Sequence, residues 1–234
     1  MFELKKLSAF DNSVQVLWEI DLKIEANEIV ALLGDNSSGK TALLSAIMGL
    51  VPVYSGGVYY NNIPVDGLPR HEYSEHGIAY FPTGGRFFAD MSVQENIEIA
   101  MYPIHLWNKR KERLIEIYEM FPLLSTLKKR YARELDAAER QLLTMARAMA
   151  SSAKLCLFDE ISYGLTPVAT EEILSIVWEL RREGGAVLLA EQYANKTLEI
   201  ADRAYVLKNG RIVYDGSCAE LLESDYVHRS YLGL

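Results

Sequence analysis

One stretch near the start of the chain combines glycine, lysine and hydroxyl residues at the spacing of a phosphate-binding loop. It fits the pattern G-x-x-x-x-G-K-[ST] of the P-loop. The glycines let the backbone wrap a phosphate closely, and consecutive N–H groups at the start of a helix then point at the anion. The lysine adds a point charge for the outer phosphates, and the final hydroxyl is placed to ligate Mg²⁺. The expected phosphate contacts are Gly34, Asp35, Asn36, Ser37, Ser38, Gly39, Lys40, Thr41 and the following Ala42.

Two adjacent carboxylates, Asp159 and Glu160, are the second group that suits this chemistry. They follow the apolar run from Leu155 to Phe158, and the carboxyl end of a strand in an open α/β sheet faces the ligand crevice. We expect Asp159 to hold Mg²⁺, directly or through water, and Glu160 to orient and deprotonate the attacking water. Such a strand end is by itself also typical of a protein surface. The upstream P-loop favours the catalytic interpretation.

The elements that would position the P-loop can be predicted from the pattern of apolar residues. Ile29 to Leu33 is a continuous apolar run, which indicates a strand buried on both faces. After the loop, apolar residues recur at helical spacing until Gly49 and Pro52 end the pattern. The alternating segment from Ile20 to Ile24 predicts a half-buried strand beside the P-loop strand, so the N-terminal third is expected to be partly antiparallel.

Hairpins, strands and helices follow in the rest of the chain. Gly56 to Ile63 predicts a hairpin that turns at Asn61-Asn62. Ile78 to Phe81 predicts a short strand. The segment from Ser92 to about Ala150 is expected to be almost entirely helical, with capping boxes at Ser92-x-x-Glu95 and Asp136-x-x-Glu139. The expected division is a core at about 1–86 and 151–222, a helical subdomain at about 87–150, and a C-terminal helix at about 217–234.

The last third returns to strands and helices. Thr166-Pro167 predicts the start of a long helix that ends at Gly184-Gly185. Ala186 to Ala190 predicts another buried strand, followed by Glu191-Gln192. A hairpin is expected to turn at Asn209-Gly210.

The composition of the chain limits the kinds of partner that it is expected to bind. The chain has 234 residues, 50% of them hydrophobic and 24% charged, which is an ordinary globular balance. Its net charge of -8 argues against nucleic acid or anionic lipid as a partner. Of the two cysteines, Cys156 lies in an apolar run and is interpreted as a small core residue, which fits a reducing cytosol. No apolar run approaches membrane-spanning length, so any membrane role is expected to come through a partner.

In this order, these landmarks resemble the ATPase subunit of an ATP-binding cassette (ABC) transporter over essentially the whole chain. The similarity is greatest to the smaller ATPase of branched-chain amino acid and amide importers. It implies a RecA-like α/β P-loop NTPase core with N-terminal antiparallel strands and an inserted helical subdomain. It also implies ATP and Mg²⁺ as cofactors, and a peripheral position on the inner face of the cell membrane. The matching stretches are Glu28–Gly34, Leu44–Leu50, Gly77–Tyr80, Glu199–Asp202, Tyr205–Leu207 and Tyr231–Leu234.

The resemblance further implies a head-to-tail dimer in which each of two ATP molecules lies between one P-loop and the opposite subunit's signature helix. Two integral membrane permease subunits and an external binding protein complete such an importer. The segment from about Thr83 to Tyr102 would dock a permease subunit, with Phe87 and Phe88 as candidate contacts, although these aromatics could equally be local core.

Several family motifs are altered in this sequence. The signature Leu-Ser-Gly-Gly-(Gln/Glu) is replaced by a stretch in which an acid stands where the family has serine. The Q-loop position is Thr83, and the histidine switch corresponds to Gln192. The nearest candidate for the family's adenine-stacking aromatic is Phe10, which could equally pack in the core, and an alignment without a gap places Asp11 at that position. The altered signature consists of Leu135, Asp136, Ala137, Ala138 and Glu139.

The sequence therefore predicts an ATPase subunit of an importer, in which Glu160 and Gln192 act in catalysis. The altered signature favours a heterodimer with a second ABC ATPase subunit over a homodimer. It also leaves open a regulatory or structural subunit that binds ATP and hydrolyses it poorly. A soluble ABC ATPase without a permease is the third alternative.

Overall fold

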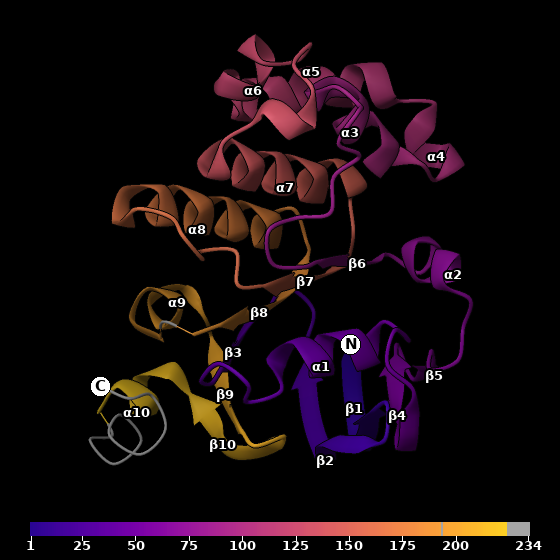
Figure 1. Cartoon of the computed structure of the whole chain (residues 1–234), viewed down its shortest axis with the longest axis vertical. Helices are drawn as coiled ribbons and strands as arrows, with labels where there is room; N and C mark the ends of the chain where they lie inside the picture. The colour runs from indigo at the N-terminus through magenta and orange to yellow at the C-terminus, as the bar shows by residue number, and fades with distance from the viewer. Residues whose placement is uncertain (193, 224–234) are drawn as a thin grey trace.

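Two β-sheets form the centre of the protein, as seen in a computed structural model that describes residues 1–192 and 194–223 (Figure 1). The smaller sheet is antiparallel, with the strand order β2-β1-β4-β5. The larger has the order β10-β9-β3-β8-β7-β6 and is parallel except for β10. The first sheet contains β1 (Phe2–Asp11), β2 (Val14–Ile24), β4 (Val53–Tyr60) and β5 (Ile63–Pro64). The second contains β3 (Ile29–Leu33), β6 (Ile78–Phe81), β7 (Leu155–Asp159), β8 (Ala186–Glu191), β9 (Arg203–Lys208) and β10 (Arg211–Ser217).

The P-loop strand β3 lies at the centre of the parallel sheet, between β8 and β9. All residues of β3, β7 and β8 are buried, as expected for strands that are covered on both faces. The prediction that the strand from Ile20 to Ile24 lies beside β3 is wrong, because β2 pairs with β1 in the other sheet. The alternation of β2 gives it one polar face, and a central strand of a parallel sheet needs two apolar faces.

Helices cover both faces of the parallel sheet and gather at one end of the molecule (Figure 1). Close to the strands lie α1 (Lys40–Ile47), α2 (Arg70–Glu75), α8 (Pro167–Arg182), α9 (Ala194–Ile200) and α10 (Cys218–Glu223). Helices dominate the segment from Ser92 to Ser151, as predicted. They are α3 (Val93–Glu98), η1 (Ile99–Met101), α4 (Ile104–Trp107), α5 (Arg110–Met120), α6 (Pro122–Thr126), η2 (Ala132–Glu134) and α7 (Ala137–Ser151). The predicted C-terminal helix is seen as α10, and its residues from 224 onward lie outside the described part of the chain.

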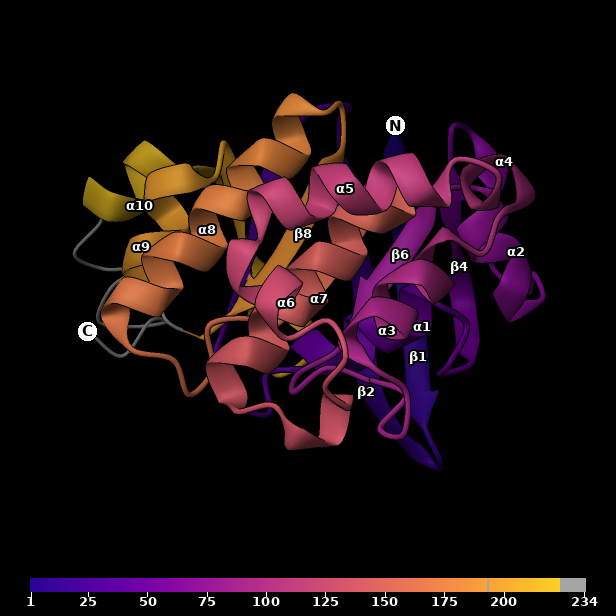
Figure 2. The same cartoon turned by 90° about the horizontal axis from the view of Figure 1, so that it is seen from above.

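The helical segment shares a hydrophobic core with one face of the parallel sheet. Ile97 of α3, Leu143 of α7 and Val177 of α8 belong to one buried cluster with Phe158 of β7. Figure 2 shows α7 and α8 lying side by side, and α5 packs against α7. The opposite face of the sheet packs against α1 and the antiparallel sheet in a second cluster. Cys156 is buried in the first cluster, as its apolar surroundings predict.

Local side-chain chemistry sets the turns and helix starts as predicted. Asn61 and Asn62 have φ angles of 50° and 64°, and Asn209 has 49°, which are the left-handed values that tight hairpin turns require. The capping boxes at Ser92 and Asp136 each form both of their reciprocal hydrogen bonds. The Thr166 hydroxyl accepts a hydrogen bond from the amide of Ala169 at the start of α8.

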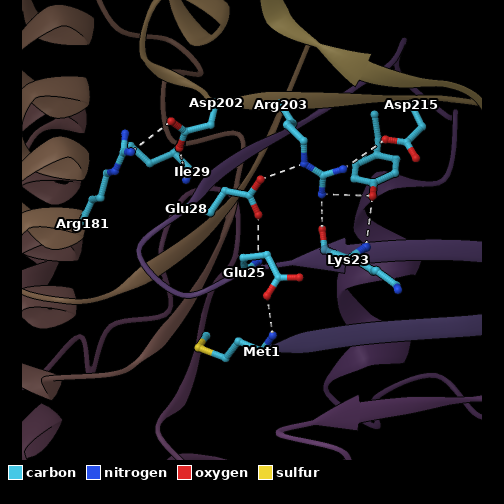
Figure 3. A network of polar contacts seen from close by, with 10 residues as sticks. Met1, Lys23, Glu25, Glu28, Ile29, Arg181, Asp202, Arg203 and Asp215 are labelled. Atoms are coloured by element: carbon cyan, nitrogen blue, oxygen red, sulfur yellow. Dashed lines mark hydrogen bonds and ion pairs between the residues drawn. The ribbon is translucent and has the colours of Figure 1, made fainter.

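A polar network secures the end of β3 that lies away from the P-loop (Figure 3). The guanidinium of Arg203 donates to Glu28 Oε1 over 2.7 Å and to the Lys23 carbonyl over 2.9 Å. Asp202 accepts from the Ile29 amide over 2.9 Å and pairs with Arg181 of α8 over 3.0 Å. These bonds join β2, β3, β9 and α8, so they fix the strand whose other end carries the P-loop.

Candidate nucleotide-binding site

The P-loop connects the carboxyl end of β3 to the first turn of α1, as the sequence predicts. Gly39 is the residue before the helix and has a φ angle of 110°, which a side chain would disfavour. Gly34 is required for a different reason, because a Cβ atom there would lie 2.3 Å from the Leu207 carbonyl oxygen. The amide of Ser38 donates to the Asp35 carbonyl over 3.1 Å and closes the turn. The loop thus has the tight backbone path that phosphate binding needs.

Lys40 reaches back from α1 into this loop. Its side-chain nitrogen donates to the carbonyl oxygens of Gly34 over 2.7 Å and Asp35 over 3.2 Å. It also forms an ion pair with Glu160, with 3.3 Å between Nζ and Oε1. Lys40 is only 5% exposed, so its positive charge is stabilised by the loop carbonyls and by the Glu160 carboxylate rather than by water.

Asp159 lies next to the P-loop hydroxyl at the carboxyl end of β7. Its Oδ2 atom accepts hydrogen bonds from Thr41 Oγ1 over 2.8 Å and from the Tyr80 hydroxyl over 3.3 Å. Its Oδ1 atom is buried and has no partner within the described chain. Burial raises the pKa of Asp159, and the bond from Thr41 partly offsets this rise. A buried carboxylate oxygen without a partner, beside a hydroxyl, suits a hard divalent cation such as Mg²⁺.

Glu160 adopts a left-handed backbone conformation, with a φ angle of 52°. Such a conformation costs of order 1–3 kcal/mol for a residue with a side chain, and it persists only where surrounding contacts impose it. Here the Glu160 amide donates to the Ala190 carbonyl over 2.8 Å, which ties this position to β8. The Glu160 side chain is 18% exposed and points to Lys40. The left-handed backbone conformation of Glu160, imposed by this hydrogen bond, therefore directs its carboxylate toward the P-loop.

A cavity of about 650 Å³ joins these residues to two turns that are distant in sequence. Its walls come from the P-loop and α1, from the β1–β2 hairpin, and from the β9–β10 turn. Phe10 is absent from this lining, and its ring instead makes an edge contact with Tyr54, with 5.2 Å between the centroids. Asp11, the gapless alternative, does line the cavity. The lining is Asp11, Gln15, Val16, Trp18, Asn36, Ser37, Gly39, Lys40, Thr41, Ala42, Ser45, Val51, Glu160, Asn209 and Gly210.

The structure also reveals cavity residues that sequence analysis did not assign. Trp18 and Gly210 lie in contact, because the Trp18 amide donates to the Gly210 carbonyl over 2.9 Å. Asn209-Gly210 was identified only as a hairpin turn, and Trp18 had no motif to mark it. These residues line the cavity because two hairpins that are distant in sequence pack against each other.

The predicted Q-loop and switch positions lie at the ends of neighbouring strands. Thr83 follows β6, and its hydroxyl donates to the backbone carbonyl of Asp159 over 3.1 Å. Gln192 follows β8 and is half-buried. Glu191, to which sequence analysis gave no role, is 2% exposed and accepts from the amide and hydroxyl of Ser162 over 3.0 and 2.7 Å. Burial raises the pKa of Glu191 to about 7.

The altered signature lies at the start of α7 and is not part of the cavity lining. Asp136 Oδ1 accepts from the Glu139 amide over 2.8 Å, and Glu139 Oε2 accepts from the Asp136 amide over 2.9 Å. Asp136, Ala137 and Ala138 are all exposed. The signature of the chain therefore lies outside its own nucleotide cavity, and the helix start carries a carboxylate of its own.

Comparison with known proteins finds a matching family and relatives that span the whole chain. A family model described as "ABC transporter" matches residues 17–162. The high-affinity branched-chain amino acid transport ATP-binding protein BraG of Pseudomonas aeruginosa is 36% identical, over 100% of this chain and 100% of its own. The probable branched-chain amino acid transport ATP-binding protein LivF of Archaeoglobus fulgidus is also 36% identical, over 100% of this chain and 99% of its own.

The fold has solved counterparts. The dimeric structure of the ATP-binding cassette MJ0796 bound to ADP and Pi matches with a TM-score of 0.83 at 22% identity. The match covers 93% of this chain and 99% of that one.

Proposed function

The chain belongs to the ABC transporter family as one of its ATP-binding subunits, and we propose that it energises an importer of branched-chain amino acids or related amides. Two full-length relatives with 36% identity carry branched-chain amino acid transport in their names, which supports the choice of branched-chain amino acids as the solute. One structural observation supports the proposed nucleotide-binding site. The P-loop, Lys40, Thr41 and Glu160 line one cavity, and Asp159 is bonded to Thr41.

Nucleotide phosphates are proposed to bind to the P-loop amides and Lys40. The Lys40 side chain already lies against the loop and is paired with Glu160 at 3.3 Å. An incoming phosphate offers Lys40 a stronger anionic partner, because charge-assisted bonds to phosphate are among the strongest in proteins. Binding would thus separate Lys40 from Glu160 and leave the Glu160 carboxylate free.

Thr41 and Asp159 are the proposed Mg²⁺ ligands. The unpartnered Asp159 Oδ1 and the adjacent Thr41 hydroxyl are hard oxygen donors of the kind Mg²⁺ prefers. When bound, the metal would neutralise charge on the phosphates. Tyr80 also donates to Asp159 Oδ2, over 3.3 Å, and so it limits the directions in which the carboxylate can turn.

Glu160 is the proposed general base. Its strained backbone is fixed to β8, so its carboxylate can accept a proton from a water molecule without a large rearrangement. Gln192 follows the same strand β8, and we assign it the position of the family's switch residue. It can donate or accept a hydrogen bond, and it carries no titratable charge.

The proposed assembly is a heterodimer of this chain with a second ABC ATPase subunit, bound to integral membrane permease subunits at the inner face of the membrane. Within residues 1–192 and 194–223, every helix is too short or too polar to span a bilayer. The preference for a heterodimer follows from Asp136, which would place a negative charge opposite the phosphate of a partner's ATP. Ala137 and Ala138 replace the family's glycines at the same helix start.

The same observation favours a second candidate, a regulatory subunit that binds ATP and hydrolyses it poorly. Asp136 and Glu139 use each other to cap α7, so the helix end that would receive phosphate is already occupied by a carboxylate. The Asp159-Glu160 pair argues against a complete loss of hydrolysis.

Glu160→Gln separates these candidates. In the first, the variant keeps its affinity for Mg-ATP and hydrolyses it slower by about two to four orders of magnitude, the usual contribution of a positioned base. Equal rates for variant and native protein would remove Glu160 as the base and support the regulatory candidate. Uptake of labelled leucine by cells lacking this gene tests the solute, with native and Glu160→Gln genes compared for rescue. Undiminished uptake in the deletion strain would exclude branched-chain amino acids.

A further inference from the structure

A second cavity, of about 320 Å³, lies at the end of the parallel sheet that is remote from the nucleotide site. Lys154 and Gly185 line it and directly precede β7 and β8, whereas the nucleotide residue Asp159 ends β7. Its other walls come from η1, α4 and α5 and from the last turns of α7 and α8. We call it the junction cavity, because it lies where the helical segment meets the sheet. Its volume is at the lower end of the range for small-molecule sites.

The charged side chains of the junction cavity balance each other, although the whole chain has a net charge of -8. A lining with equal numbers of both signs is best matched by a ligand that is neutral overall and carries one charge of each sign. A phosphate or a polyamine would leave an excess of one sign. The lining has three basic and three acidic side chains, which are Lys109, Arg113, Lys154, Glu112, Glu116 and Glu183.

Arg113 occupies two of these carboxylates. Its Nη1 atom donates to Glu116 over 2.8 Å, and its Nη2 atom donates to Glu183 over 2.8 Å and to the Met149 carbonyl over 2.9 Å. These bonds tie α5 to the carboxyl ends of α7 and α8 and give the cavity a fixed frame. The Nε atom is buried without a partner in the described chain, so one donor of this guanidinium is left over.

Lys109, Lys154 and Glu112 remain available to a ligand. All three are exposed, and none forms an ion pair with any residue that the structure describes. The two ammonium groups can bind a carboxylate, and the Glu112 carboxylate can bind an ammonium group. The cavity also contains Ser152 and Glu183, at which α7 and α8 end. The carbonyl oxygens at the carboxyl end of a helix favour a cation.

An apolar wall faces these charges. Met101, Met149 and Leu180 are buried, Leu106 is half-buried, and all four line the cavity. Methionine side chains are flexible and adapt to the shape of what they contact. The wall therefore suits an aliphatic group of a few carbon atoms.

From the balanced charges and the apolar wall, we propose that the junction cavity binds a free α-amino acid with an aliphatic side chain. The chemical class follows from the cavity, whereas the choice of branched-chain amino acids as its representatives rests on the proposed function. The ligand carboxylate lies at Lys109 and Lys154, its ammonium group at Glu112, and its side chain against Met149 and Leu180. The subunit thereby has a site for the solute class that the proposed importer delivers.

The test is a set of equilibrium titrations of the full chain, followed by ligand-observed NMR. Leucine, isoleucine and valine are compared with two analogues of leucine. The first, 4-methylpentanoate, lacks the ammonium group, and the second, 3-methylbutylamine, lacks the carboxylate. Each analogue is expected to bind about tenfold or more weakly than leucine, the ratio for one lost charge-assisted hydrogen bond. Alanine should also lose about tenfold or more, because it leaves the apolar wall uncovered.

Substitutions assign each charge to its partner. Glu112→Gln should remove the advantage of leucine over 4-methylpentanoate, and Lys109→Gln together with Lys154→Gln should remove its advantage over 3-methylbutylamine. Glu119→Gln and Lys111→Gln are the matched controls, because they remove the same charges from exposed positions of α5 outside the cavity lining, and they should leave every affinity unchanged.

Ala153→Met should abolish binding, because it fills the cavity from the half-buried loop before β7. If this variant does not fold, the substitutions at the exposed positions still decide the question.

An absence of saturable binding by all three branched-chain amino acids up to about 10 mM would overturn the proposal. Equal affinity of the native chain for leucine and for one of its singly charged analogues would also overturn it, as would leucine binding that no cavity substitution weakens.

Mg-ATP affinity is measured on the same samples. A chain that binds Mg-ATP but none of these amino acids refutes the junction site alone, whereas a chain that fails to bind Mg-ATP refutes the proposed nucleotide site. Leucine binding to the cavity, together with undiminished uptake in the deletion strain, refutes the proposed solute and leaves the junction site in place.

Discussion

Asp136→Asn is expected to accelerate ATP hydrolysis by this chain when it is the only ATPase present. In a head-to-tail dimer, the start of α7 from one protomer would face the terminal phosphate held by the other. Asp136 is exposed at that helix start, with its Oδ1 atom bonded to the Glu139 amide over 2.8 Å. Its negative charge would then oppose closure of the dimer around ATP, and Asn removes the charge while keeping the shape.

The size of the effect follows from Coulomb's law. A carboxylate about 5 Å from one phosphate charge costs about 3 kcal/mol at an effective dielectric near 20, and about 0.8 kcal/mol in bulk water. Asp136 is solvent-exposed in the free protomer and would be partly covered in the dimer, so the cost lies between these limits. The corresponding gain in the closed dimer runs from about fourfold to more than a hundredfold. It should shrink as salt is added, because salt screens exposed charges.

Asp136→Asn tests the charge alone, because it leaves the helix cap in place. Asn, Asp and Ser are about equally good at this position, so Asp136→Asn should hardly change the free energy of unfolding. Restoring the whole family signature with Asp136→Ser, Ala137→Gly and Ala138→Gly should also raise hydrolysis. Two glycines in the first turn of α7 would, however, cost up to about 1 kcal/mol each.

The assay is the rate of ATP hydrolysis as a function of protein concentration, for the native chain and both variants, at low and high salt. We expect a low native rate and a steeper concentration dependence for both variants, with urea unfolding as the control for stability. If the native chain alone hydrolyses ATP with a steep concentration dependence that neither variant improves, the asymmetric dimer is wrong. If only the triple variant is faster, backbone flexibility rather than charge explains the weak signature.

Two further substitutions test the interior of the site. Lys40→Ala should weaken Mg-ATP affinity and cost about 1–3 kcal/mol of stability, because the Gly34 carbonyl and the Glu160 carboxylate lose their buried partner. Unchanged affinity in a titration would show that the P-loop is not the phosphate-binding site. Glu191→Gln should flatten the pH dependence of stability. Burial raises the pKa of Glu191 to about 7 from 4.5, so its contribution is fully present below pH 4.5 and is lost as pH rises through 7. In urea unfolding at pH 8 the variant should be the more stable by up to about 3 kcal/mol, and an equal pH slope for both proteins would contradict this.

Features that depend on local side-chain chemistry could be predicted from the sequence. The P-loop is encoded in one octapeptide that carries its own glycines, lysine and hydroxyl. The capping box at Asp136 and the turn at Asn209-Gly210 also depend on residues a few positions apart. In each case the pattern of residue types and the backbone geometry have the same short-range cause.

Features that depend on packing between distant segments could not be predicted in this way. An alternating pattern shows that β2 has one buried face, but it does not show which strand is its neighbour, and the assignment beside β3 failed. Trp18 reaches the nucleotide cavity because its amide bonds to Gly210, which is far away in the sequence.

Asp159 is the point at which these separate segments meet. Its side chain accepts from Thr41 of the P-loop and from Tyr80 of β6, and its backbone carbonyl accepts from Thr83 at the Q-loop position. A longer Q-loop side chain could reach toward a metal, but the short Thr83 hydroxyl is already engaged with the backbone. Tyr80 of β6 and Thr83, which follows it, therefore both hold Asp159, so a displacement of β6 would act on the proposed Mg²⁺ ligand through these two hydrogen bonds.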